Sequence, residues 1–277
     1  MSRIQFRHGI PGVVPSAWVI HPDAGSRAVA PVVAVHGLNR ETEVMANLLA
    51  PRADATGRTI VLPIFDRTSW RRYQRAACAQ RSDWALIALL DALRDERVIQ
   101  GGPPDLSGFS GGAQFAHRFA WLHPDQVARL CLVAPGWWTF PDARGAFPLA
   151  IGTGCNGQSF RLRANIKRFL DRQMHVSVGA LDVKQDRNLR QDAEVVALQG
   201  ANRVERARRW TAAAIRAARR VGVAPRISFD LMAHCVHSFS DCVANARLDR
   251  AFVPDFTPQL QTNQPPFRGH DQLGKVA

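Results

Sequence analysis

Short apolar runs rich in valine, isoleucine and leucine alternate along the chain with longer segments whose apolar residues recur at helical spacing. The short runs predict strands over residues 18–20, 31–35, 59–62, 130–133, 176–178 and 227–231. The longer segments predict helices from Met45 to near 57, over 84–93, from 111 to before Pro124, near 166 and through 203–220. This alternation predicts the α/β fold class, a mostly parallel sheet with helices on both faces.

The length of 277 residues suits one large domain, which we expect over residues 1–255. Residues 256–277 are rich in proline and glutamine and predict a poorly ordered tail. Residues from about 136 to 165 lie between a predicted strand and a predicted helix. We expect them to form a small cap.

The amino-terminal segment lacks the apolar core of a signal peptide, and the longest apolar runs are too short to span a bilayer. The sequence therefore predicts a cytoplasmic protein with no membrane span. Its five cysteines show no metal-ligand spacing, so we expect no metal. Cys131 lies in an apolar run and is expected to pack as a small hydrophobe. A bridge between Cys235 and Cys242 remains open.

The net charge of +13 raises the question of a nucleic-acid partner. Much of the positive charge lies on the predicted helix over 203–220, and a solvated arginine-rich face is the simpler interpretation. No zinc-finger, homeodomain or aromatic RNA-binding pattern accompanies it, so we expect no nucleic acid. The charge is still suited to attracting anionic substrates or surfaces.

The segment Gly108-Phe109-Ser110-Gly111-Gly112 fits the pattern Gly-x-Ser-x-Gly between a predicted strand end and a predicted helix. In that context the serine occupies a strained turn with its hydroxyl above the sheet. The flanking glycines permit close approach of neighbouring segments, and the helix start presents free N–H groups. A glycine-rich turn that performs no chemistry is the alternative.

Two further predicted strand ends carry groups that such a serine needs. Asp182 closely follows the strand over 176–178, and His237 lies beyond the strand over 227–231, so the chain order is Ser, Asp, His. His234 is an alternative to His237. The alternatives to Asp182 lie downstream and are Asp186, Asp192 and Glu194.

A serine hydroxyl becomes an effective nucleophile when an imidazole takes its proton, and a carboxylate fixes the imidazole tautomer. An ester carbonyl under attack also needs N–H donors for its developing oxyanion. We expect these from the backbone of Gly111 and of Leu38. His36 is expected to hold the turn that carries Leu38 rather than to act as the base.

The chain resembles the α/β-hydrolases, and among them the esterase branch related to polyhydroxybutyrate depolymerases and feruloyl esterases. The resemblance covers roughly residues 30–245 and is carried by Val35–Arg40, Gly108–Phe115, Gly179–Asp182 and Val236–Ser238. It implies that Ser110 is the nucleophile, Asp182 the acid and His237 the base. Relatives commonly have glycine directly before the histidine, where this chain has Val236.

Trp137, Trp138, Phe140 and Phe147 fall in the expected cap. They are expected to line an apolar substrate pocket, with packing of the cap against the body as the alternative. Trp70 and the arginines that follow it suggest an opposite rim suited to a substrate carboxylate.

The function predicted from these residues is hydrolysis of carboxylic esters through an acyl-enzyme, without metal or cofactor. Small or oligomeric esters are the expected substrates. Cleavage of thioesters, lactones or amides by the same groups is the nearer alternative. A non-catalytic binding protein that uses the basic helix is the more distant one.

Overall fold

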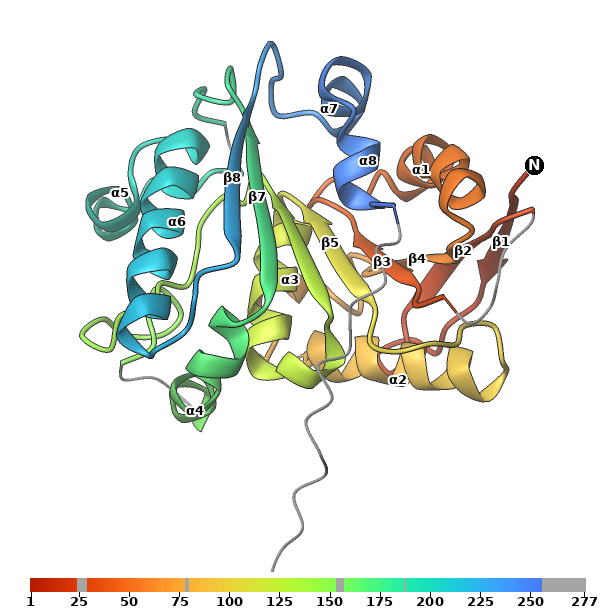
Figure 1. Ribbon diagram of the computed structural model, residues 1–277, viewed down its shortest axis with the longest axis horizontal. Helices are drawn as coiled ribbons and strands as arrows, with labels where there is room; N and C mark the ends of the chain where they lie inside the picture. The colour runs from red at the N-terminus through yellow and green to blue at the C-terminus, as the bar shows by residue number, and fades with distance from the viewer. Residues whose placement is uncertain (24–28, 78–79, 153–156, 187, 256–277) are drawn as a thin grey trace, which may run out of the picture.

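A sheet of eight strands runs through the middle of the molecule (Figure 1). The computed structural model describes residues 1–23, 29–77, 80–152, 157–186 and 188–255. The first three strands of the sheet are antiparallel neighbours, and every pair from β4 to β8 is parallel. In spatial order the strands are β1 (Arg3–Arg7), β2 (Ser16–His21), β4 (Ile60–Ile64), β3 (Val32–Val35), β5 (Asp105–Phe109), β6 (Arg129–Val133), β7 (Gln173–Gly179) and β8 (Ile227–Met232).

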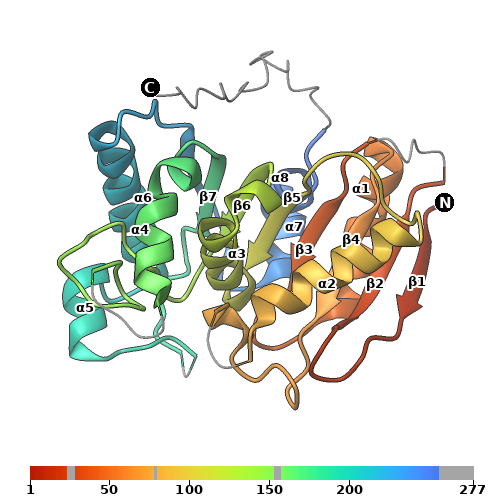
Figure 2. The same cartoon turned by 90° about the horizontal axis from the view of Figure 1, so that it is seen from below.

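Helices cover both faces of this sheet, as Figure 2 shows from below. One face carries α1 (Thr42–Thr56), α7 (Phe239–Ala246) and α8 (Leu248–Phe252). The other face carries α2 (Ser82–Asp95), α3 (Gly111–Leu122), α4 (Gln158–Leu170) and α6 (Arg203–Arg220), with α5 (Ala193–Gln199) packed on α6. The predicted α/β architecture is therefore confirmed.

The apolar runs read from the sequence are the strands that both helical layers bury. All four residues of β3 are buried, because helices on both faces of a parallel sheet remove both sides of the strand from water. The helix after β3 ends at Gly57, whose φ of 64° is the left-handed conformation that glycine adopts readily at a helix end.

The parallel strands bring their carboxyl ends to one edge of the sheet, where open α/β sheets bind their ligands. β3 leads there into His36 and Gly37, and β5 leads into Ser110. From the other half of the chain, β7 is followed by 180–182 and β8 by 233–237. Segments far apart in sequence thus meet at one edge.

Strand β1 is an element that the sequence prediction omitted. Ile4 and Phe6 alternate with Arg3, Gln5 and Arg7, which is the period of a strand. It pairs only with β2, as an edge strand. In the described ranges no helix has both the length and the apolar character needed to cross a membrane. The expected tail, 256–277, lies outside the described residues, as do Cys78 and Cys155.

Candidate active site

Ser110 lies in a strained turn between β5 and α3. Its backbone φ of 53° and ψ of −112° are unusual for a residue with a side chain. The turn is held by the Ser110 N–H, which donates to the Val133 carbonyl at 2.8 Å. A Cβ on Gly108 would lie 2.4 Å from the Gly112 backbone, and one on Gly112 would lie 2.1 Å from the Val35 oxygen. Only residues without side chains fit at these two positions.

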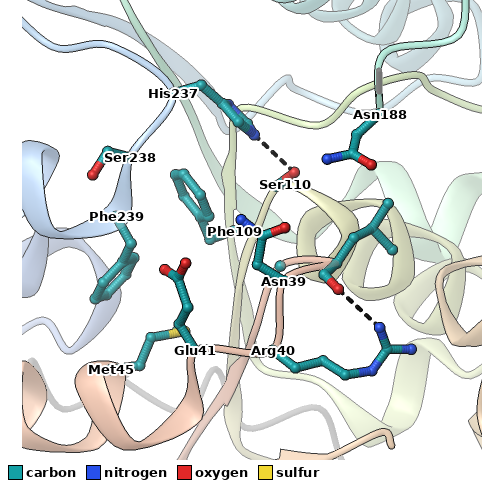
Figure 3. Close-up of a pocket in the computed structure, with 12 residues that line it drawn as sticks. Asn39, Arg40, Glu41, Met45, Phe109, Ser110, Asn188, His237, Ser238 and Phe239 are labelled. Atoms are coloured by element: carbon teal, nitrogen blue, oxygen red, sulfur yellow. Dashed lines mark hydrogen bonds between the residues drawn. The ribbon is translucent and has the colours of Figure 1, made fainter. Parts of the chain in front are cut away.

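Ser110, His237 and Asp182 form a continuous hydrogen-bonded chain. His237 Nε2 lies 3.0 Å from Ser110 Oγ, and His237 Nδ1 lies 2.7 Å from Asp182 Oδ2 (Figure 3 shows the first of these contacts). Asp182 is buried, whereas the His237 side chain is about one quarter exposed. The structure therefore brings the three predicted side chains together in the order that proton transfer from the serine requires.

The alternatives to these residues lie elsewhere. His234 is exposed, has a φ of 59°, and bonds to neither Ser110 nor Asp182 within the described residues. Asp192 is the residue directly before α5, and its side chain pairs with Arg190. Glu194 is exposed in the first turn of the same helix.

The loops that carry Asp182 and His237 are joined directly to each other. The Leu181 N–H donates to the Cys235 carbonyl at 3.0 Å, and the Asp182 N–H donates to the Gly179 carbonyl at 3.0 Å. A Cβ on Gly179 would lie 2.3 Å from the Cys235 oxygen, so glycine permits this approach. The two loops therefore hold Asp182 and His237 in a fixed relation.

Aromatic packing and a helix cap orient the His237 ring. The ring stacks on Phe109 with centroids 5.1 Å apart, and Phe109 meets Phe239 edge to face. Ser238, the next residue, accepts a hydrogen bond from the Asp241 N–H and so caps α7. His237 therefore lies directly before the residue that caps α7.

Arg203, at the start of α6, is a site residue that sequence reasoning missed. Its side chain is 1 % exposed and lies 3.1 Å from Asp182 Oδ1 and 2.7 Å from Asp186 Oδ2. Burial would raise the pKa of Asp186, but the Arg203 guanidinium outweighs burial and the pKa is lowered. Asp186 therefore pairs with Arg203 and takes no part in the bond to His237.

The arginine-rich helix has two different faces. Arg203 and Arg206 are buried, and Arg206 donates to the backbone carbonyls of Gly136, Arg190 and Gly200. The remaining arginines of α6 are exposed, as expected for a solvated face; they are Arg208, Arg209, Arg216, Arg219 and Arg220. Arg203 and Arg206 are spaced along the helix so that they fall on the same face as Trp210 and Ala214. This spacing could have indicated from the sequence that the two arginines are buried.

His36 holds the turn that carries Leu38. Its Nε2 accepts from the Phe65 N–H at 3.0 Å, so Nδ1 carries the proton and donates to the Gly37 carbonyl at 2.7 Å. Burial lowers the pKa of His36 to about 4 and keeps the ring neutral. The Tyr73 hydroxyl donates to the His36 carbonyl at 2.5 Å.

The Leu38 turn approaches the start of α3 closely. A Cβ on Gly111 would lie 2.9 Å from the Leu38 side chain and 3.0 Å from the Tyr73 hydroxyl. The N–H groups of Leu38 and Gly111 donate to no acceptor within the described residues. Two free backbone donors therefore accompany the Ser110 turn.

A cavity of about 160 Å³ opens in front of Ser110. Apolar groups on its walls come from Leu38, Met45, Phe109 and Phe239, and polar groups come from Asn39, Arg40, Glu41, Asn188, His237 and Ser238 (Figure 3). Arg40 is anchored in the wall, since its guanidinium donates to the carbonyls of Leu38 and Phe65. The cavity is small and joins apolar and polar surfaces.

The expected aromatic pocket is not formed by Trp137, Trp138 and Phe140. These side chains are at most 6 % exposed, and none of them lines the cavity in front of Ser110. Trp138 stacks on Trp210 of α6 at 4.2 Å, and Trp137 packs against the Arg118 guanidinium at 4.0 Å. Packing between α3 and α6, the alternative interpretation, accounts for them.

The cap expected over about 136–165 also differs from the structure. Residues 136–152 fold back on themselves through hydrogen bonds such as Phe140 N–H to the Leu149 carbonyl, and residues from 158 belong to α4. None of the described residues of this segment lines the Ser110 cavity. Phe147 is partly buried against the core.

One group of side chains in the described residues has the composition of a metal site, and consists of Cys235, Asp241 and Cys242. Both cysteines are buried free thiols, so the structure has no disulfide between Cys235 and Cys242. Burial raises the pKa of both. Asp241 is already bonded to the Val236 N–H and to Asn245. Cys131 is a buried free thiol, as expected.

Solved structures with the same architecture include two bacterial polymer hydrolases. Poly(aspartic acid) hydrolase-1 from Sphingomonas sp. KT-1 matches with a TM-score of 0.76 and 19 % identity, over 89 % of this chain and 97 % of its own. The poly(3-hydroxybutyrate) depolymerase LpqC from Bordetella parapertussis matches with a TM-score of 0.74 and 23 % identity, over 90 % and 89 %. The chain has the α/β-hydrolase fold.

A third solved structure, an S-formylglutathione hydrolase from Agrobacterium tumefaciens, matches with a TM-score of 0.57 and 15 % identity, over 91 % of this chain and 94 % of its own. No family model and no curated protein matches the sequence. At these identities the similarity establishes the fold alone, and the same fold carries many different activities.

Proposed function

We propose that the chain is a serine hydrolase that cleaves carboxylic esters through an acyl-enzyme on Ser110. The observation that supports this most is the hydrogen-bonded chain from Ser110 Oγ through His237 to Asp182, at 3.0 and 2.7 Å. The strained turn adds to it, because such strain is often retained at catalytic positions. The hydrolases of the same fold are consistent with this proposal.

In the first half-reaction Ser110 Oγ attacks the ester carbonyl carbon, and its proton passes to His237 Nε2. The imidazolium that forms keeps its Nδ1–H bond to Asp182, whose carboxylate stabilises the positive charge. The tetrahedral intermediate then expels the alcohol, which takes the proton from His237 Nε2. The acyl group remains on Ser110.

In the second half-reaction a water molecule gives its proton to His237 Nε2 and attacks the acyl carbon. Collapse of the second tetrahedral intermediate returns that proton to Ser110 Oγ and releases the acid. In both halves the carbonyl oxygen gains negative charge. We assign its stabilisation to the N–H groups of Leu38 and Gly111, and the loss of one such donor typically costs about 3 kcal/mol.

Arg203 is assigned a positioning role. Its bond to Asp182 Oδ1 leaves Oδ2 directed at His237, so the carboxylate cannot rotate freely. The buried guanidinium also compensates the buried charge of Asp182.

The proposal is tested by turnover of short-chain 4-nitrophenyl esters and by labelling with a fluorophosphonate probe. Ser110→Ala is expected to abolish both while the circular dichroism spectrum stays unchanged. Ser240→Ala is the matched control, because Ser240 is an exposed serine of α7 that does not line the cavity. Labelling that maps to Ser238, or turnover retained in Ser110→Ala, would refute the assignment.

Thioesters, lactones and amides are attacked by the same nucleophile in the same way, so they form the second candidate substrate class. An S-formylglutathione hydrolase and a poly(aspartic acid) hydrolase share the fold. A panel with one acyl group carried on oxygen, sulfur and nitrogen distinguishes these classes by kcat/KM.

A further inference from the structure

A second cavity of about 500 Å³ adjoins the one in front of Ser110. The two share Leu38, Asn39, Arg40 and Asn188 in their walls, so they lie side by side along the turn after β3. Because Leu38 carries one of the N–H groups assigned to the oxyanion, a substrate held at Ser110 would lie next to the second cavity.

The second cavity is positively charged. Three guanidinium groups line it, from Arg40, Arg67 and Arg71, and no carboxylate among the described residues does. Arg67 and Arg71 are exposed and have no acidic partner among the described residues. Asp66, beside Arg67, is bonded to the backbone N–H groups of Thr68 and Ser69. Two arginines are thus left without a counterion in a concave surface.

The remaining polar residues of the lining carry no charge. Gln74, Asn39 and Asn188 add uncharged amides to the lining. Arg40 donates to the Leu38 and Phe65 carbonyls and is therefore held in place. In Figure 3 Glu41 lies on the Met45 side of the turn, whereas the Arg40 side chain extends the opposite way.

We propose that this cavity is a subsite for a carboxylate carried by the ester that Ser110 cleaves. Arginine presents a planar set of donors that matches a carboxylate, and pairs of arginines attract anions before contact. Glu41 disfavours a carboxylate at the other end of the site and so orients the substrate. The inference rests on the proposed ester hydrolysis, and it names the substrate class as esters with a free carboxylate.

The test compares two esters with acyl chains of equal length, mono-4-nitrophenyl adipate and 4-nitrophenyl hexanoate. We expect wild-type kcat/KM to favour the anionic ester, with a preference that falls as salt is added. Arg67→Gln and Arg71→Gln are each expected to lower the ratio of the two kcat/KM values about threefold, and the double variant about tenfold. Arg72→Gln is the matched control, because Arg72 is exposed next to Arg71 but does not line the cavity.

A second pair, 4-acetoxybenzoate and 4-methylphenyl acetate, places the carboxylate in the alcohol part instead. A charge-dependent preference in either pair that the double variant loses supports the subsite and shows which part of the substrate enters it. The proposal is overturned if wild type shows no preference in both pairs, if the double variant keeps it, or if Arg72→Gln loses as much.

If the proposed ester hydrolysis itself is wrong, the result is different: wild type and Ser110→Ala will turn over every ester at the same rate. The subsite is in that case tested by calorimetric titration with monoethyl adipate. Weaker binding to the Arg67→Gln/Arg71→Gln protein than to wild type supports it, and equal binding overturns it.

Discussion

Replacing Asp182 by asparagine is expected to have a severe effect, because Arg203 dictates how the new amide must lie. The guanidinium has only donors to offer, and in wild type it faces Asp182 Oδ1 at 3.1 Å. The asparagine oxygen must therefore take that position, and the amide NH₂ must face His237 Nδ1. His237 is then forced to carry its proton on Nε2, 3.0 Å from the hydroxyl that it should deprotonate.

The wrong tautomer removes the general base without removing any atom from the site. We expect kcat/KM for a neutral 4-nitrophenyl ester to fall about 10⁴-fold in Asp182→Asn, which corresponds to about 5 kcal/mol of transition-state stabilisation. Turning the amide over would leave its NH₂ against the buried guanidinium, at a cost of about 1.5–3 kcal/mol for the unsatisfied groups.

Removal of the guanidinium should therefore restore part of the activity that the asparagine loses. In the double variant Asp182→Asn/Arg203→Met the amide is free to present its oxygen to the His237 Nδ1–H. A cost of that size corresponds to at least about a tenfold rise in kcat/KM over Asp182→Asn alone. The four kcat/KM values of the cycle, with circular dichroism to confirm folding, give the measurement.

Two results would refute this reasoning. The first is an Asp182→Asn protein within tenfold of wild type, which would mean that Asp182 does not set the tautomer. The second is an Arg203→Met change that lowers activity by the same factor with Asp182 and with asparagine present. Additivity of that kind would show that the guanidinium does not orient the amide.

Three further predictions concern stability. Burial depresses the pKa of His36 to about 4 from an unfolded value of 6.5, so the unfolded state gains a proton first as pH falls. The free energy of unfolding, measured by urea titration, should therefore drop by about 2 kcal/mol from pH 7 to 5. His36→Asn should make this dependence on pH weaker, and an unchanged dependence would contradict the assignment. Gly112→Ala should destabilise the fold by about 3 kcal/mol or more through its clash with Val35, whereas Gly102→Ala, with open space around it, should change the melting temperature little; equal losses would refute the packing explanation. Ser110→Gly should melt higher than Ser110→Ala, since glycine adopts the positive φ without strain of about 1–3 kcal/mol; a lower melting temperature would argue against stored strain.

The sequence was informative where a residue's own property, such as its apolar character or its lack of a side chain, determined its position in the fold. Continuous apolar runs identified the buried strands, and the glycines around Ser110 identified the turn, because only glycine fits there. The positions of Asp182 and His237 followed from strand ends, since parallel strands place those ends along one edge. These properties are local and can be read from a single chain.

Residues whose role depends on a partner far away in sequence were not predictable in the same way. Arg203 reads as one more arginine on a charged helix, and only the fold places it against Asp182. Trp137 and Trp138 read equally well as a substrate pocket or as core, because an apolar ring suits both. Trp70 was expected at the rim of the substrate pocket, but its side chain is 2 % exposed and belongs to the core.

The backbone bond between the Leu181 N–H and the Cys235 carbonyl has a consequence for how activity would be lost. It couples Asp182 and His237 at the carboxyl ends of adjacent strands, β7 and β8, while Ser110 follows β5 on the far side of β6. Fraying of that outer pair would withdraw both proton-handling groups in one event. Heating or denaturant should then switch turnover off as a single step, ahead of global melting, with no partly active species in between.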